Sequence, residues 1–259
     1  MTVFGPTDQT TADQQRPIAR VPWIVLGALM LLRTVLLFGG DGLTYAVLRL
    51  TGSSTGTWSH ALLFSNAHIV LTDVATVAVL FWLCRREGLK VTDLLGRVRR
   101  GRDLLVGLAL GVGLIIAFYA LTYLVNLGAM LLTRSGPPAG SALPVPLWLG
   151  VWSILVIPVT IAIAEELLYR GYLLPHVAAR IGWWPAALVV SFAFGLQHAA
   201  FSATSVEAVL TRVLTLFGLG IGLSVLARWL KRLVPLIIGH WMVDVVGLGL
   251  PMLMAGLAR

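Results

Sequence analysis

The sequence predicts an all-α fold, a polytopic bundle of about seven or eight transmembrane helices. Of the 259 residues, 58% are hydrophobic and 12% are charged, whereas soluble domains are about half apolar and a quarter charged. The mean hydropathy is +0.90, and several apolar stretches have the roughly 20 residues that a helix needs to cross a ~30 Å hydrocarbon layer. We expect one transmembrane domain over 21–259, embedded in a lipid bilayer.

Helices are predicted near 21–38, 61–84, 104–132, 148–174, 184–200, 206–227 and 234–257. Each stretch is apolar and is bounded by charged or turn-forming residues. The segment 41–50 is too short and too interrupted to span, so it is interpreted as a re-entrant or interfacial piece. If it pairs with its neighbours as a broken span, the helix count rises to eight.

The connections between helices are alternately rich and poor in lysine and arginine. The connection 85–103 holds seven of these residues and 228–232 holds three, whereas 39–60 and 133–147 hold one each. Because basic loops resist translocation, we expect the rich connections and the N-terminus in the cytoplasm. Seven helices would then place the C-terminus outside. Topology explains the formal charge of +8, and no nucleic-acid partner is expected.

Residues 1–20 are polar and lack the apolar core and cleavage site of a signal peptide. We expect them to form a short disordered tail on the cytoplasmic side. The single cysteine, Cys84, excludes an internal disulfide and a thiolate metal cluster.

Ionisable side chains within the apolar stretches are costly in hydrocarbon and usually functional. Glu166 and Arg170 stand four residues apart, so they are expected to pair on one helix face and to leave Glu165 facing another direction. Four-residue spacings also join an aromatic ring to His198 and a carboxylate, Asp244, to His240.

Other ionisable residues are expected to have structural rather than catalytic roles. Asp73 is expected to hydrogen-bond within the bundle, and Arg33 and Arg212 to pair or to reach the interface. The histidines His60 and His68, like His176, lie close to helix ends, where they need no special role.

The motif residues are expected at similar depths. Glu165 and His198 are nearly equidistant in sequence from the turn at 181–182, and His240 lies eight residues past Arg232, or roughly 12 Å along a helix. We therefore expect their side chains to meet in one pocket that opens toward the cytoplasm.

Three motifs follow one another on successive helices: Glu-Glu-x-x-x-Arg at 165–170, Phe-x-x-x-His at 194–198 and His-x-x-x-Asp at 240–244. Together they resemble the CAAX-protease and bacteriocin-processing family, which includes the type II CAAX prenyl endopeptidases and bacterial relatives called Abi proteins. The resemblance covers about 145–250, and the Arg-Gly-Tyr-Leu-Leu segment at 170–174 also fits it.

The resemblance implies an intramembrane endopeptidase. Glu165 and His198 would hold and deprotonate the attacking water, His240 and Asp244 would stabilise the oxyanion, and Glu166 with Arg170 would fix the architecture of the site. Its substrate would be a peptide or protein at the membrane, prenylated by analogy, or else a leader peptide or membrane-protein loop. A bacterial plasma membrane is the expected location.

Asp244 departs from the family pattern, in which asparagine is common at this position. An ionised carboxylate only accepts hydrogen bonds. Asp244 is therefore either protonated at depth and donates to the oxyanion, or ionised and orients His240 by accepting its N–H.

Metal dependence also stays open. No cofactor is firmly implied, but Glu165, His198 and His240 could form a three-ligand open site for a divalent metal such as zinc. We favour a metal-independent glutamate mechanism.

Two other functions are compatible with buried ionisable residues. A transporter or proton-coupled channel uses such groups as a relay, but it needs a path to both sides, and the clustering at one depth favours a cavity. The second is a non-catalytic immunity or scaffold member of the same family; the chemically competent residue at every motif position favours an enzyme instead.

Overall fold

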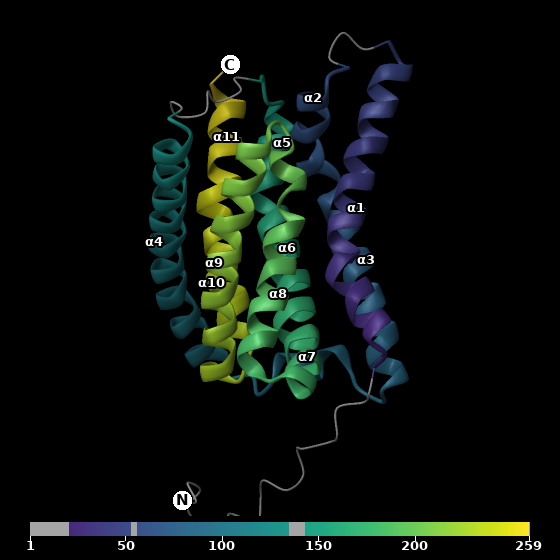
Figure 1. Ribbon diagram of the computed structural model, residues 1–259, viewed down its shortest axis with the longest axis vertical. Coiled ribbons are helices and arrows are strands. Elements are labelled where there is room, and N and C mark those ends of the chain that lie inside the picture. The colour runs from purple at the N-terminus through teal and green to yellow at the C-terminus, as the bar shows by residue number, and fades with distance from the viewer. Residues whose placement is uncertain (1–20, 53–55, 135–142, 259) are drawn as a thin grey trace, which may run out of the picture.

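In a computed structural model, residues 21–52, 56–134 and 143–258 are described, so the predicted tail 1–20 lies outside the described residues. The helices run along a common direction and form one bundle (Figure 1). They are α1 (Trp23–Leu50), α2 (Trp58–Leu63), α3 (Ser65–Arg86), η1 (Val91–Leu95), α4 (Arg100–Thr133), α5 (Leu147–Leu155), α6 (Ile157–Glu165), η2 (Glu166–Leu173), α7 (Leu174–Ile181), α8 (Trp183–Gln197), η3 (Ala200–Ser202), α9 (Val206–Leu230), α10 (Val234–Asp244), η4 (Val245–Gly249) and α11 (Leu250–Leu257).

Five helices in the described ranges are long and apolar enough to cross a membrane: α1, α3, α4, α9 and the continuous run from α10 to α11. The helices from α5 to α7 bend by 41° at the break after Leu155, and they make a sixth span if the bent pair is counted as one. Between this span and α9 lies α8, an apolar helix of 15 residues. The predicted all-α polytopic bundle is confirmed.

The interpretation of 41–50 as a separate piece is wrong, because α1 continues through it to Leu50. A polar and a glycine residue that interrupt the apolar stretch near position 41 pack against α3. Asp41 is fully buried and accepts hydrogen bonds from Ser65 and from Nε2 of His68, the latter at 3.0 Å. Gly40 makes room for this contact, since a Cβ there would lie 2.6 Å from Cε1 of His68. Gly40 therefore allows a close approach of α1 to α3, and 41–50 does not form a span of its own.

The basic connections gather at one end of the bundle, the lower end in Figure 1. Leu233 donates its backbone N–H to the carbonyl of Leu95 over 2.9 Å, which ties the connection before α10 to η1. The guanidinium of Arg228 lies 4.5 Å from the ring centroid of Trp183, at the start of α8. We call the segments 85–103, 180–183 and 228–233 the basic end.

The opposite end, called the far end, contains the end of α1, the helix α2 and the connection 198–205. The rings of Tyr45 and Trp58 pack at 5.7 Å between centroids, and Trp58 donates from Nε1 to the carbonyl of Ala203 over 2.9 Å. These contacts hold three segments that are remote in sequence at one level of the bundle.

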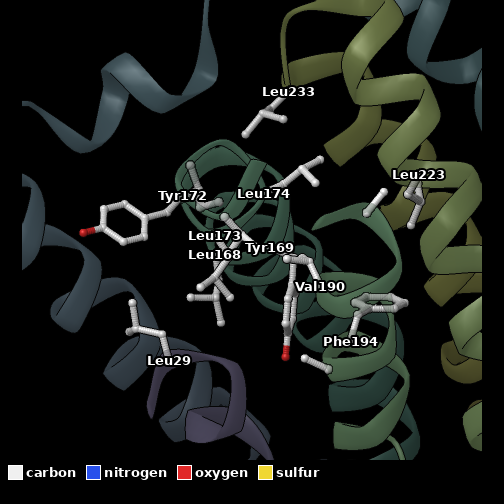
Figure 2. Close-up of a cluster of buried hydrophobic side chains, with 14 of the residues drawn as sticks. Leu29, Leu168, Tyr169, Tyr172, Leu173, Leu174, Val190, Phe194, Leu223 and Leu233 are labelled. Atoms are coloured by element: carbon white, nitrogen blue, oxygen red, sulfur yellow. The ribbon is translucent and has the colours of Figure 1, made fainter. Parts of the chain in front are cut away.

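The main hydrophobic core runs from the basic end to the residues that line the site, such as Phe118 and Val243. Figure 2 shows its centre, where side chains of η2 and α8 interdigitate with residues from α1, α9 and the segment before α10. Tyr169, Leu168, Val190 and Phe194 are all fully buried. This packing positions the polar residues that lie next to it along the same helices.

Candidate active site

The two adjacent glutamates point to different partners. Glu165 is the last residue of α6 and Glu166 the first of the π-helical segment η2, and both are buried. Oε1 of Glu165 accepts from Nη2 of Arg33 over 3.0 Å, whereas Oε1 of Glu166 accepts from Nη1 of Arg170 over 3.1 Å. The predicted pair of Glu166 with Arg170 and the divergence of Glu165 are confirmed. Short π-helical segments are frequent at functional sites.

His240 is held by Glu166. Its Nδ1–H donates to Oε1 of Glu166 over 2.9 Å, because a carboxylate can only accept. This bond turns Nε2 of His240 toward Glu165 and Asp244, whose nearest oxygens each lie 3.7 Å away. A separation of 3.7 Å is too long for a hydrogen bond. The residue that orients His240 is therefore Glu166, not Asp244.

His198 follows the last residue of α8 and caps that helix. Its Nδ1–H donates to the carbonyl of Phe194 over 2.8 Å, which leaves Nε2 as the acceptor nitrogen. The predicted shared face of Phe194 and His198 is confirmed, with the two rings 5.1 Å apart between centroids. The ring of Phe194 also lies 6.0 Å from that of His240, so one phenyl group packs against both histidines.

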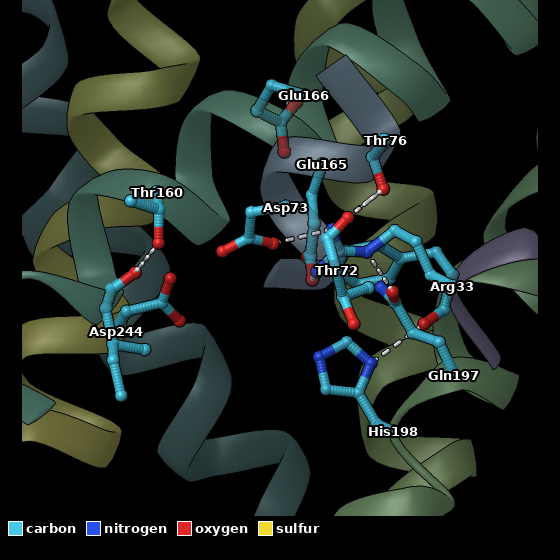
Figure 3. A network of polar contacts seen from close by, with 12 residues as sticks. Arg33, Thr72, Asp73, Thr76, Thr160, Glu165, Glu166, Gln197, His198 and Asp244 are labelled. Atoms are coloured by element: carbon cyan, nitrogen blue, oxygen red, sulfur yellow. Dashed lines mark hydrogen bonds and ion pairs between the residues drawn. The ribbon is translucent and has the colours of Figure 1, made fainter. Parts of the chain in front are cut away.

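Arg33 is a fully buried hub that the sequence analysis did not place at the site. Figure 3 shows it reaching toward residues of three other helices. It donates to Oδ1 of Asp73 over 2.7 Å, to Oε1 of Gln197 over 2.6 Å and to Glu165. Asp73 thus hydrogen-bonds within the bundle as expected. The sequence feature that could have identified Arg33 as part of the site is its position in an apolar stretch, because an unpaired charge there is costly.

Four of the six predicted residues line one cavity of about 40 Å³: Glu165, His198, His240 and Asp244. One water needs roughly 10–15 Å³ of such space, so the cavity has room for water. Glu166 and Arg170 lie behind it, which suits the supporting role that the resemblance implies. The rest of the wall consists of Ile69, Phe118, Ile161, Phe201, Arg212, Leu216, Leu219, Val243, Gly247 and Leu248.

Polar atoms without partners lie on this wall. Oε2 of Glu165, Oδ2 of Asp244 and Nε of Arg212 are buried and have no hydrogen-bond partner within the described part of the chain. Buried polar atoms are usually satisfied, so such exceptions mark places for water or a ligand. Arg212 is the second residue that sequence reasoning left outside the site.

The residues of the alternative metal site do not form a cluster of ligands. Among the residues that the structure describes, no three His, Cys, Asp or Glu side chains are grouped so that they could hold a metal ion. Glu165, His198 and His240 share the cavity wall without forming such a group. We therefore derive no step through a metal.

Glu165, His198, His240 and Asp244 line one cavity, in keeping with the similar depths that their spacing from the basic connections predicts. The opening of this cavity toward the cytoplasm stays a prediction.

Residues 146–246 match the family model described as Type II CAAX prenyl endopeptidase Rce1-like. No curated protein and no solved structure matches the chain. The matched segment contains all six candidate residues, and it confirms the resemblance drawn from the three motifs. The match supports a CAAX-type intramembrane protease in general terms.

Proposed function

We propose that this protein is an endopeptidase that hydrolyses a peptide bond inside the membrane with a water activated by Glu165 and His198. The observation that carries the proposal is the cavity, in which a carboxylate oxygen of Glu165 that has no partner among the described residues shares one small space with His198, His240 and Asp244. The match to a CAAX prenyl endopeptidase model over the same helices supports this reaction class.

Glu165 is arranged as the general base. Arg33 engages Oε1 and so fixes the carboxylate, while Oε2 has no partner among the described residues. A water in the cavity can donate one hydrogen to Oε2 and the other to Nε2 of His198. As the water oxygen bonds to the peptide carbonyl carbon, its proton passes to Glu165. When the C–N bond breaks, Glu165 returns that proton to the leaving amine.

The opposite part of the wall is arranged to stabilise the oxyanion. When His240 is protonated on both ring nitrogens, it presents Nε2–H to the cavity, because its Nδ1–H donates to Glu166, and Asp244, when protonated, adds an O–H donor. Arg212 brings a cationic side chain to the same wall. Preorganised donors of this kind stabilise the charge that develops in the transition state.

We propose a peptide segment of a membrane-associated protein as the substrate. Most of the cavity wall is apolar, so it suits hydrophobic side chains beside the scissile bond. Prenylation of the substrate remains an expectation from the family resemblance.

The test is cleavage by purified protein in liposomes of internally quenched peptides that carry a farnesyl or a palmitoyl anchor. Glu165→Gln keeps an acceptor for Arg33 but removes the base, and His198→Ala removes the second water ligand. Each should lower kcat/KM by at least about 10²-fold, the usual contribution of a general base. His60→Ala is the control, since His60 lies in α2 outside the cavity.

The losses in the double variant should be non-additive, because both residues serve one water. Full activity of Glu165→Gln would refute the proposed base. A divalent-metal chelator should leave the rate unchanged; loss with chelator and recovery with zinc would replace the proposed mechanism by a metal-dependent one.

A further inference from the structure

We infer that the groove between α1 and α3 binds a phospholipid with an anionic headgroup, with an acyl chain in the groove and the phosphate at Arg85 and Arg86. The inference goes beyond the proposed peptidase activity and does not depend on it. Figure 1 shows the two helices next to each other at one edge of the bundle. The wall of this α1–α3 groove includes Ile24, Ala28 and Leu32 of α1 and Val79, Trp82 and Leu83 of α3.

The α1–α3 groove has the dimensions and the chemistry that an acyl chain requires. Along α1 it extends from Ile24 to Leu32, a rise of roughly 12 Å, and one leaflet contributes roughly 15 Å to a ~30 Å hydrocarbon layer. Its volume is about 300 Å³, within the range of about 300–1,000 Å³ that ligand sites have. Leu29 and Leu83 are buried at its base, whereas Ile24 is 82% exposed. Because both helices are long and apolar enough to span the membrane, the open side of the groove faces lipid.

Two arginines lie where the α1–α3 groove meets the basic end. Trp82 belongs to the wall of the groove and also to a second hollow, which Phe81, Arg85 and Arg86 complete. The guanidinium of Arg86 lies 3.9 Å from the ring centroid of Trp82, and that of Arg85 lies 5.7 Å from the ring centroid of Phe81. These cation–π contacts hold both charges beside the apolar groove. An apolar channel that ends at two cations matches the chain and the phosphate of one lipid.

Both arginines are available to a ligand. Neither forms an ion pair with a carboxylate in the described ranges, and both are exposed. The acidic residue next to them, Glu87, is engaged by Tyr172 and by Nε2 of His176, the latter at 3.1 Å. Arginine binds phosphate oxygens through two parallel N–H donors. The pair can therefore accept a phosphate without breaking an existing contact.

The start of α1 adds a third cation at the same end. The guanidinium of Arg180 lies 4.9 Å from the ring centroid of Trp23, the residue before Ile24, and its buried Nη1 has no hydrogen-bond partner among the described residues. Tryptophan is enriched at the membrane–water interface, so Trp23 and Trp82 indicate that this end lies at the level of the headgroups. Basic pockets between transmembrane helices bind anionic headgroups. A zwitterionic lipid would bring its own cation close to three arginines, which favours an anionic lipid instead.

A lipid in the α1–α3 groove would brace the helices that hold Glu165. Arg33 follows Leu32 in α1, and its Nη1 lies 2.7 Å from Oδ1 of Asp73 in α3. The same guanidinium donates to Glu165. A ligand that binds the folded chain and not the unfolded chain raises the melting temperature. The anionic lipid should therefore stabilise the bundle.

The test is lipid retention and thermal unfolding of the purified full chain in detergent micelles with dioleoylphosphatidylglycerol or dioleoylphosphatidylcholine. Native mass spectrometry counts the lipids that the protein retains from an equimolar mixture. The wild type should prefer phosphatidylglycerol and should melt at a higher temperature with it. Arg85→Gln/Arg86→Gln should lower this preference at least about tenfold, since each arginine near an anionic surface contributes about fivefold.

Arg97→Gln/Arg100→Gln is the matched control. It removes two exposed arginines from the same end of the bundle, but neither of them lines the groove or the second hollow. This variant should keep the preference of the wild type. An equal preference in the two double variants would overturn the inference, because the effect would then be absent or would follow net charge alone.

A second pair of variants tests the groove itself. Ala28→Trp fills it from α1, whereas Ala78→Trp adds the same side chain at an exposed position of α3 outside it. Ala28→Trp should retain less phosphatidylglycerol than the wild type, and Ala78→Trp should retain as much. Equal retention by the two tryptophan variants would contradict a chain in the groove. All the substituted positions are exposed, and melting without added lipid verifies that each variant is folded. No arm measures cleavage, so failure of the proposed function would leave these results intact.

Discussion

The charged residues around the cavity differ in how many partners each would lose on mutation. Arg33 has two carboxylates, Asp73 and Glu165, whereas Arg170 has Glu166 as its one carboxylate in the described ranges. Removing one member of a buried pair is strongly destabilising because the other charge is left without compensation. The cost of a substitution should therefore follow the number of partners that remain.

Glu166→Gln should destabilise the protein by about 3–5 kcal/mol, because it leaves Arg170 unpaired and weakens the hold on His240. Glu165→Gln should cost less, since Arg33 retains Asp73 and Gln197. Thermal unfolding of both variants in detergent measures the difference. Equal melting temperatures for Glu166→Gln and the wild type would contradict the assigned pairing.

Asp244→Asn should retain or raise kcat/KM. The structure gives the orientation of His240 to Glu166, and the Asp244 oxygen lies 3.7 Å from Nε2 of His240, so the donor role is the one that remains for residue 244. An amide donates at any pH, whereas a carboxyl donates only when protonated. The wild-type rate should therefore fall as rising pH ionises Asp244, and the Asn variant should lack this fall. An inactive but folded Asp244→Asn would contradict the donor role.

The helices place these residues through close backbone contacts and irregular turns. The predicted helix 148–174 is divided in the structure into α5, α6 and the π-helical η2, and a second π-helical segment, η4, begins just after Asp244. Both π segments border site residues. Local sequence patterns do not reveal them, because the extra residue in a π turn is stabilised by packing between helices.

Gly195→Ala should lower both stability and activity. A Cβ at this position would lie 2.7 Å from the carbonyl oxygen of Val213 and 2.9 Å from the backbone nitrogen of Phe217, so α8 and α9 would have to separate. Overpacking of this kind costs about 1–3 kcal/mol, and His198 lies within one turn of the displaced backbone. The measurements are thermal unfolding and kcat/KM.

Gly222→Ala is the matched control in α9, since no atom lies within 4 Å of the added Cβ. Alanine forms helix better than glycine by about 1 kcal/mol, so this variant should be neutral or slightly stabilised. If Gly195→Ala behaved in the same way, the close contact between α8 and α9 would not be needed for the site.

For the whole molecule, the two ends of the bundle differ in charge and in how they are held. The basic end carries most of the positive charge of the described residues, and the ion pair of Arg232 with the fully buried Asp103 ties it together. The far end carries little charge.

The sequence by itself determined the fold class, most of the helix positions, the three motifs and the family resemblance. These depend on hydropathy over about 20 residues and on four-residue spacings along one helix, which are local properties. The family match over 146–246 agrees with them.

Only the tertiary structure decided that Arg33 anchors Glu165 and that Glu166 and not Asp244 orients His240. Each of these depends on which side chains from separate helices meet. Spacing along a chain determines depth and helix face, but the partner across the bundle and the filling of the space between them come from the packing of all helices together.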